Sequence, residues 1–176
     1  RSLFSCLEPA TLATCASARQ TRAYKSGEQL FSFGDLTGDV ICVESGAVKF
    51  EIKTSAETRF LVSMAGAGDL VSCLSQPKIG LYSAVAVGPV SACTLSRESF
   101  DRIERHDSKM HIYIVERLSS LIEAAVASKV DFGTLSVRER VAKTLKALAH
   151  KFGVADDAQG VKIDFPLRRK DLADLS

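Results

Sequence analysis

Three consecutive basic residues, Arg168, Arg169 and Lys170, stand at the start of a predicted helix in the last segment, "PLRRKDLADLS". The backbone amides and the dipole at a helix N-terminus already favour an anion, and these side chains add positive charge. The three residues therefore have the chemistry to bind a phosphate group. A solvated basic turn is the alternative that stays open.

The cysteines offer a different chemistry. The five are Cys6, Cys15, Cys42, Cys73 and Cys93. They are odd in number, scattered, and form no C-x-x-C pair, so we expect free thiols in a reducing cytoplasm. The three histidines all lie beyond residue 105. A metal site is not expected, because zinc needs four ligands at close spacing.

Charge is distributed unevenly along the chain. Residues 1–132 hold 14 Lys and Arg against 15 Asp and Glu, whereas residues 133–176 hold 9 against 6. A composition that is 46% hydrophobic and 25% charged is typical of a globular protein. No run of eighteen apolar residues occurs, so we expect neither a membrane span nor a secretion signal.

Short apolar runs alternate with turn residues between Tyr24 and about Leu95. Seven runs have strand character: "QLFSF", "DVICVESG", "AVKFEI", "RFLVSM", "DLVSCL", "YSAVAV" and "SACTLS". Turn signals separate them, among them Ser45-Gly46 and Gly88-Pro89. Seven or eight strands at even spacing predict a closed or double-sheet β architecture such as a jelly roll. Residues 7–20 predict a helix in front of it.

The pattern turns helical after Arg97. "SRESFDRIERH" predicts a short helix, and residues 109–132 predict a long one. A heptad stripe follows the long helix: His111, Ile114, Leu118, Leu121, Ala125, Ser128 and Phe132. The helix could pack along its own domain or form a coiled coil across a dimer. A second set, Val115, Ile122 and Val126, widens the apolar face, and we favour a dimer.

The last quarter of the chain predicts three further elements. Gly133 is expected to end the long helix, and Ser136 with Glu139 forms a capping box that opens the next, which Gly153 ends. "VADDAQG" is predicted to be a polar loop and "VKIDF" a short strand. "PLRRKDLADLS" then begins one more helix.

This order of elements, and the residues that carry it, resemble the CRP/FNR family of bacterial transcription regulators. The matching segments are "KSGEQLFSFGD" (25–35), "VICVESGAVKF" (40–50), "GAGDLVSCL" (66–74), "YSAVAV" (82–87), "VRERVAKTLKALA" (137–149) and "KIDFPLRRKDLADLS" (162–176). The resemblance implies an α+β fold in three parts. These are an effector-sensing β-roll of the cyclic-nucleotide-binding kind with flanking helices (1–107), a dimerisation helix (108–133) and a truncated winged helix-turn-helix (134–176).

The resemblance also implies a function and partners. We expect a cytoplasmic homodimer that binds a palindromic site on double-stranded DNA and works with RNA polymerase. Arg169 corresponds to the arginine that contacts phosphate in the family, and Arg168 and Lys170 flank it. Arg168 stands where the family usually has a threonine N-cap. The dimer interface is expected to include Ile114, Leu118, Leu121, Ala125 and Phe132, and the recognition helix and wing to lie beyond Ser176.

Family members differ in what they sense. Members that bind cyclic AMP hold it with Gly-Glu-Leu and Arg-Ser, where this chain has Ser72-Cys73-Leu74 and Tyr82-Ser83. Lys78 is the one local cation, and a phosphate without a matched cation is costly. Cyclic AMP is therefore not expected, although Ser72, Cys73, Lys78, Tyr82 and Ser83 remain the effector-pocket candidates. The sequence of the matching segments is closest to the FNR/FixK side of the family, whose members respond to redox, gas or other signals. The alternative function is a cyclic-nucleotide or other small-molecule sensor module.

The cofactor stays open. In iron-sulfur members three closely spaced N-terminal cysteines and a fourth from the β-roll hold the cluster. Cys93 falls where the fourth is expected and is our redox candidate, but the triplet would lie before Arg1, and a small buried cysteine is the alternative. For haem, His106 and His111 are the candidate ligands. The residues present support neither group.

An enzymatic function is not expected. A jelly-roll metal enzyme of the cupin kind needs two or three histidines and a carboxylate that project from strands. Residues 24–95 contain no histidine.

Overall fold

The structure is a computed structural model that describes residues 7–54, 58–71, 78–79, 82–156 and 160–176. Its helices are α1 (Pro9–Ala18), α2 (Arg97–His106), α3 (Ser108–Thr134), α4 (Val137–Phe152) and α5 (Arg169–Leu175). Its strands are β1 (Gln20–Tyr24), β2 (Gln29–Phe31), β3 (Leu36–Thr37), β4 (Val40–Lys53), β5 (Arg59–Ala65), β6 (Lys78–Ile79), β7 (Ser83–Leu95), β8 (Gly153–Asp156) and β9 (Gly160–Ile163). We call β1 to β7 the roll and the segment from α4 to α5 the head.

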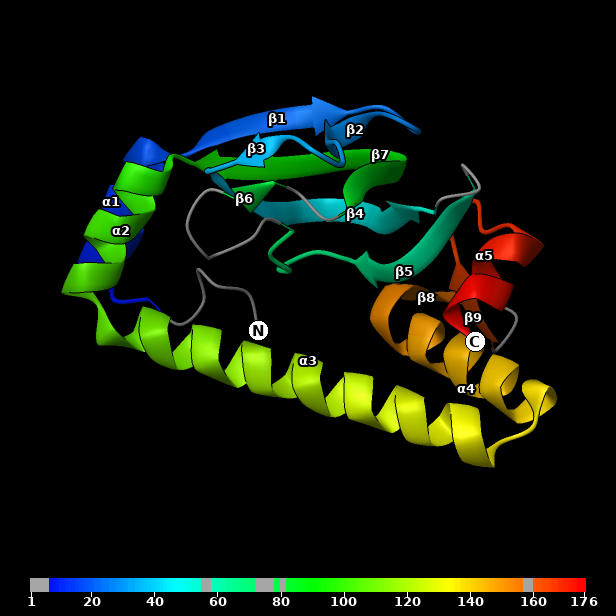
Figure 1. Cartoon of the computed structure of the whole chain (residues 1–176). Coiled ribbons are helices and arrows are strands. Elements are labelled where there is room, and N and C mark those ends of the chain that lie inside the picture. Colours follow the sequence, from blue (N-terminus) through cyan, green and yellow to red (C-terminus); the bar gives the residue numbers. More distant parts are fainter. Residues whose placement is uncertain (1–6, 55–57, 72–77, 80–81, 157–159) are drawn as a thin grey trace.

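The elements form two connected bodies (Figure 1). α1 and α2 lie together at one end of the roll, and the long helix α3 runs beneath the roll toward the other end. There α4 turns back, α5 sits beside β5, and the hairpin β8–β9 follows α4. The head therefore contacts the roll directly as well as through α3.

The main sheet of the roll is antiparallel, in the order β1-β7-β4-β5, with β2 also paired to β7. β4 and β7 pair along nearly their whole lengths, from Val40↔Leu95 to Glu51↔Ser83. β5 pairs only with β4 and is an edge strand. The sheet with its helices confirms the α+β fold expected from the sequence.

Two predicted turns lie inside continuous strands. Gly46 was expected to separate two strands, but β4 runs through it, with shifts of register against β7 between Val43 and Ala47. Gly46 has φ +88°, a value that glycine adopts without penalty. β7 likewise continues through Gly88-Pro89. A glycine between two apolar runs therefore marks an irregularity of the ladder here, because the neighbouring strands hold both halves in one sheet.

Other boundaries also differ from the predictions. β1 was missed, because four of its five residues are exposed and it has no apolar alternation. The polar loop predicted after α4 is wrong, because Gly153–Asp156 forms β8 and pairs with β9. α3 continues past Gly133 to Thr134. Of the predicted strand "DLVSCL", the structure describes only residues 69–71, in which Leu70 forms a bridge to Cys42.

The apolar core falls into three clusters. One fills the roll, and one joins α1, α2 and the start of α3 to the end of the roll. The third joins roll and head: Ala47, Leu61, Met64 and Val87 from the roll pack with Leu148, Phe152, Ile163, Phe165, Leu167, Leu172 and Leu175 from the head. We call it the shared cluster. No helix in the described parts of the chain is long and apolar enough to cross a membrane.

The predicted capping box at the start of α4 is confirmed. Ser136 Oγ accepts a hydrogen bond from the Glu139 amide at 3.4 Å, and Glu139 Oε2 accepts one from the Ser136 amide at 2.8 Å. The hydrogen bonds from the Ser136 hydroxyl and amide lower the pKa of Glu139. Two of the amides that a helix start leaves without partners are thus satisfied locally.

Ser136→Ala is expected to lower the free energy of unfolding by about 1 kcal/mol, because the Glu139 amide loses its acceptor. Urea unfolding followed by circular dichroism measures the change. Ser120→Ala is the control, since the Ser120 hydroxyl donates only to the Glu116 carbonyl of its own helix; a change within about 0.5 kcal/mol is expected there. Equal stability of Ser136→Ala and the wild type would show that the box does not hold α4.

Candidate functional site

Arg168, Arg169 and Lys170 lie together at the start of α5, and all three are exposed. Arg168 is the N-cap and has no side-chain oxygen to accept from the Asp171 amide. Only the reciprocal half of a capping box is present: Asp171 Oδ2 accepts from the Arg168 amide at 2.9 Å and also from Arg168 Nε at 3.4 Å. Among the interactions recorded for the described residues, none involves the Arg169 guanidinium. Arg169 is thus the member of the three best placed to meet an anion.

Lys170 is engaged by the roll. Its ammonium donates to the Arg59 carbonyl at 2.8 Å and to Asp174 Oδ2 at 2.7 Å. The same Asp174 oxygen accepts from the Leu61 amide at 3.0 Å. Although burial raises the pKa of Asp174, the hydrogen bonds from Lys170 and Leu61 lower it overall. α5 is therefore fastened to the backbone of β5 by two of its own side chains.

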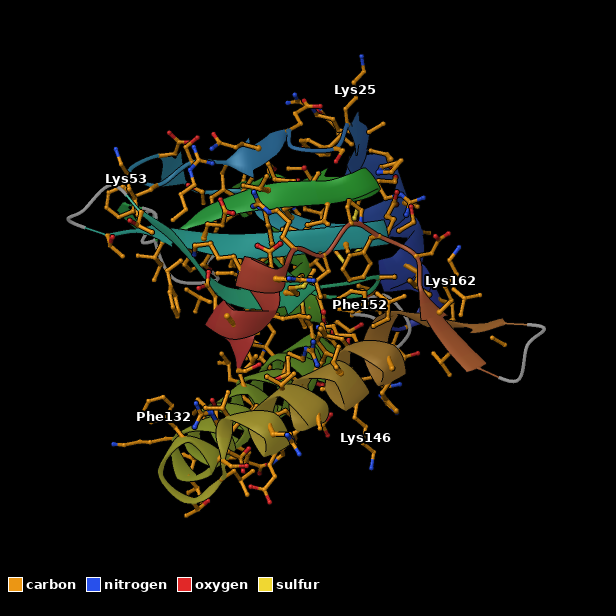
Figure 2. All side chains as sticks on the ribbon, turned by 90° about the vertical axis from the view of Figure 1, so that its right-hand side faces the viewer. Lys25, Lys53, Phe132, Lys146, Phe152 and Lys162 are labelled. Atoms are coloured by element: carbon orange, nitrogen blue, oxygen red, sulfur yellow. The ribbon has the colours of Figure 1, made fainter. Side chains whose placement is uncertain are left out.

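Phe152 carries the apolar part of this contact. The side chain lies on the side of α4 that faces the sheet, whereas Lys146 points away on the opposite side (Figure 2). The Phe152 ring stacks edge-on against Phe165, with 5.1 Å between centroids. A Cβ atom at Gly66 would lie 2.7 Å from Phe152 Cε1, so the roll approaches the ring closely at that turn. Only glycine leaves the ring this space.

Asp69 is the charged residue that joins the roll, α3 and α4. It is buried, and its Oδ2 accepts from the Gly66 amide at 2.9 Å and lies 2.6 Å from Lys151 Nζ. Its Oδ1 pairs with the Arg117 guanidinium of α3. Burial and Arg117 lower the pKa of Lys151 to about 8, while the Asp69 carboxylate favours the charged form. Lys151 is therefore charged at pH 7.

Asp69 was given no role in the sequence analysis, where it appears only within the segment 66–74. Its partners Arg117 and Lys151 are 48 and 82 residues away along the chain. The signal that could have drawn notice is the Gly-Ala-Gly-Asp turn itself, because a buried carboxylate needs a cation.

Among the described residues, no contact joins the effector-pocket candidates to one another. The Tyr82 ring lies against Phe31 and Phe50, at centroid distances of 5.7 and 5.0 Å. Ser83 Oγ accepts from the Phe33 amide at 2.9 Å. Lys78 is described only as a backbone position in β6, and Ser72 and Cys73 lie outside the described residues. An effector pocket at these residues stays a prediction.

Comparisons with solved structures assign this arrangement to a known fold. The catabolite activator protein of Thermus thermophilus is 25% identical to this chain and superposes with a TM-score of 0.64. The match covers 84% of this chain and 70% of the activator. The regulator CLP of Xanthomonas campestris is 19% identical, covers 96% and 84%, and has a TM-score of 0.77. FixK2 of Bradyrhizobium japonicum is 20% identical, covers 89% and 76%, and has a TM-score of 0.76.

All three are CRP/FNR regulators. The chain has the CRP/FNR fold. The expected cyclic-nucleotide-binding-like sheet with helices is therefore confirmed. No protein-family model matches the sequence, and the comparison with curated proteins finds no match. The neighbouring structures are transcription regulators and cyclic-nucleotide-binding proteins, with some regulatory domains of protein kinase A among them.

The described residues bring together no set of ligands for the iron-sulfur cluster of CRP/FNR proteins. Cys93 is buried in β7 directly opposite Cys42 of β4, and both are free thiols, as is Cys15. The hydrogen bond to Cys93 and burial raise the pKa of Cys42, and burial raises that of Cys15. Within the described ranges no group of three or more His, Cys, Asp or Glu could hold a metal ion. A redox role for Cys93 stays a prediction.

Each of the two haem-ligand candidates has a polar partner in α2. A ring nitrogen of His106 lies 2.7 Å from the Arg102 carbonyl, and His111 Nε2 lies 3.5 Å from Glu104. Both histidines are exposed. A hollow between α1 and α2 lies beside His106, lined by Ala10, Thr11, Thr14, Arg102 and Ile103. Haem binding at either histidine stays a prediction.

Most side chains of the predicted heptad stripe on α3 are exposed to solvent. Met110 and Tyr113 are buried against the roll, and Ile114 is half-buried. Further along, Leu118, Leu121 and Phe132 are 50%, 55% and 72% exposed, and Ala125 is exposed as well. The second set continues the face, with Val115, Ile122 and Val126 also exposed. A single copy thus leaves most of the predicted interface uncovered.

Proposed function

We propose that this protein is a homodimeric DNA-binding transcription regulator of the CRP/FNR type. The observation that carries the proposal is the joining of a cyclic-nucleotide-binding-like roll, a 27-residue helix and a head with Arg168, Arg169 and Lys170 at the start of α5. The match to CLP covers 96% of the chain, more than the roll and the long helix can supply together. The head is therefore part of the likeness.

We further propose that residues 1–107 sense the signal, 108–133 hold two copies together, and 134–176 belong to a winged helix-turn-helix that contacts DNA. Exposed apolar side chains such as Leu118 and Leu121 support pairing through α3, because a contiguous apolar patch on a protein surface usually marks an interface. A symmetric dimer presents two heads, as a palindromic operator requires. RNA polymerase is the expected partner of such a regulator.

The proposed signal is of redox, gas or another kind, and is not cyclic AMP. With such a signal the chain would belong to the FNR/FixK side of the family, which is part of the proposal. Tyr82 stacks on aromatic rings where members that bind cyclic AMP have an arginine for the phosphate, which supports the proposal. The effector candidates Ser72, Cys73, Lys78, Tyr82 and Ser83 and the redox candidate Cys93 are carried forward on the sequence argument alone.

A cyclic-nucleotide or other small-molecule sensor module is the second candidate. CLP is described as responsive to cyclic di-GMP, and Arg117 and Lys151 bring two cations to the end of the roll. Both cations are taken by the Asp69 carboxylate, however, and a phosphate would have to displace it. Titration calorimetry with cyclic AMP and cyclic di-GMP, together with a measurement of DNA binding, distinguishes the candidates: nucleotide binding without DNA binding favours the sensor module.

Arg169→Gln is expected to reduce the salt dependence of DNA binding. A phosphate contact releases about one counterion, so the slope of log K against log salt should fall by about 0.9 in a protein that carries the complete head. Fluorescence anisotropy with a duplex at several salt concentrations measures the slope. Lys25→Gln is the control, since Lys25 lies on the roll on the side away from α4 (Figure 2). Equal slopes for the wild type and Arg169→Gln would contradict a phosphate contact.

A further inference from the structure

The free edge of the roll is covered by the head. An edge strand presents backbone N–H and C=O groups that have no partner in the sheet. In β5 three of these groups are satisfied by side chains of the head: Lys170 and Asp174 bond to the backbone at Arg59 and Leu61, and Lys151 donates to the Met64 carbonyl at 3.0 Å. Side chains of the head thus satisfy backbone groups of β5 that a further strand would otherwise pair with.

The covering has a polar fastening at each end and an apolar middle. Lys170 and Asp174 of α5 fasten one end, and Lys151 of α4 fastens the other through Asp69. The shared cluster lies between them, with Phe152 against Gly66. Arg117 holds the same Asp69 carboxylate from α3, so one buried side chain is bound by the roll, the long helix and the head.

When the head is docked on the roll, Lys170 is less available for its proposed contact with a DNA phosphate. The Lys170 ammonium gives two of its three N–H donors to the Arg59 carbonyl and the Asp174 carboxylate, so its charge is partly used before it meets a phosphate. A phosphate that approached Lys170 in place would also meet the negative charge of Asp174, and like charges at close range repel. DNA and the edge of β5 therefore compete for the same side chain.

We propose that the docked head is an autoinhibited state, in which the Asp69–Lys151 ion pair acts as a latch that keeps Lys170 on β5 and away from DNA. The inference rests on the proposed function and adds its regulation. Asp69 precedes the effector candidate Ser72 by three residues in the sequence. A signal that moves this turn changes the latch directly, without passing through the long helix.

Lys151→Met tests the latch, because methionine keeps the apolar stem beside Phe152 and removes the charge. Lys146→Met is the matched control, with the same change on the opposite side of α4 (Figure 2). The first measurement is hydrogen–deuterium exchange of the Leu61 amide, whose acceptor Asp174 belongs to the head. In Lys151→Met this amide is expected to exchange about tenfold faster than in the wild type, and in Lys146→Met at the wild-type rate.

The second measurement is the affinity of the full-length regulator, with its complete head, for a mixed-sequence duplex of about 40 base pairs at about 50 mM salt. Binding to such DNA depends on phosphate contacts and needs no known operator. Lys151→Met is expected to bind about fivefold more tightly than the wild type. Lys146→Met should bind no more tightly than the wild type.

The outcomes separate the latch from the function on which it rests. Unchanged Leu61 exchange in Lys151→Met overturns the latch. Faster exchange with equal or weaker DNA binding overturns autoinhibition, because the contact would then position the head for DNA. If neither the wild type nor any variant binds the duplex, the proposed function fails and the inhibition with it, whereas the exchange measurement still reports whether Lys151 holds the head.

Discussion

Leu118→Lys is expected to convert the protein from a dimer to a monomer. Leu118 is half exposed in a single copy and lies in the middle of the stripe along α3. Burial of a leucine side chain contributes about 1.5–3 kcal/mol, and a symmetric interface contains the residue twice. Loss of both leucines, with two ammonium groups facing each other, should weaken the dimer by about 3 kcal/mol or more, which is about 100-fold in Kd.

Sedimentation equilibrium of the 176-residue chain at micromolar concentration measures this change. The control is Ser120→Lys: two positions further along, about 200° around the helix, Ser120 lies opposite Leu118 and between Glu116 and Glu123. This variant should remain dimeric. A wild-type chain that is monomeric at these concentrations, or a dimeric Leu118→Lys, would contradict pairing through this face. Binding to a palindromic site should be lost together with the dimer, because one head spans only one half-site.

Gly46→Ala is expected to destabilise the roll strongly. Gly46 has φ +88°, and a Cβ there would lie 2.3 Å from the Pro89 carbonyl oxygen of the neighbouring strand. The strained backbone alone costs about 1–2 kcal/mol, and the overlap with backbone atoms adds to it. We expect a loss of about 3 kcal/mol or more in the free energy of unfolding, measured by urea titration.

Gly27→Ala separates the two causes. Gly27 has a similar φ of +82°, but a Cβ there would meet nothing within 4 Å. Its substitution should cost about 1–2 kcal/mol, from backbone strain only. If both alanine variants lose the same stability, the approach of β4 to Pro89 is not what requires glycine at position 46.

Features that depend on neighbours in sequence were predicted well. The capping box of Ser136 and Glu139 joins residues three apart, and both of its hydrogen bonds are present. α2 and α4 likewise follow from periodicity and stop signals over a dozen or so residues. Gly46 was recognised as special, but the sequence alone does not distinguish a turn from a kink inside a strand. That distinction is made by the partner strand, whose register is a long-range property.

The contacts of the head with the roll could not be predicted. The sequence indicated a truncated winged helix-turn-helix after Gly133, and the apolar residues of this segment pack in the shared cluster with the roll. Which surface covers them depends on Asp69, Arg117 and Lys151, three residues from distant segments with no common spacing. The basic residues of α5 were found because they are adjacent, whereas the engagement of Lys170 by Arg59 involves a carbonyl that every residue possesses.

The central position of β7 has a consequence for how the chain folds during synthesis. β1 and β4 flank β7, and their pairs join residues as far apart as Gln20 and Thr94. Pairings so distant in sequence close slowly, and none can form before β7 has left the ribosome. The nascent chain must therefore carry β1 to β5 incomplete until then, while α3 and α4, held by local hydrogen bonds, can form as soon as they emerge. Chaperones that bind unpaired strands should act on this protein until β7 has left the ribosome.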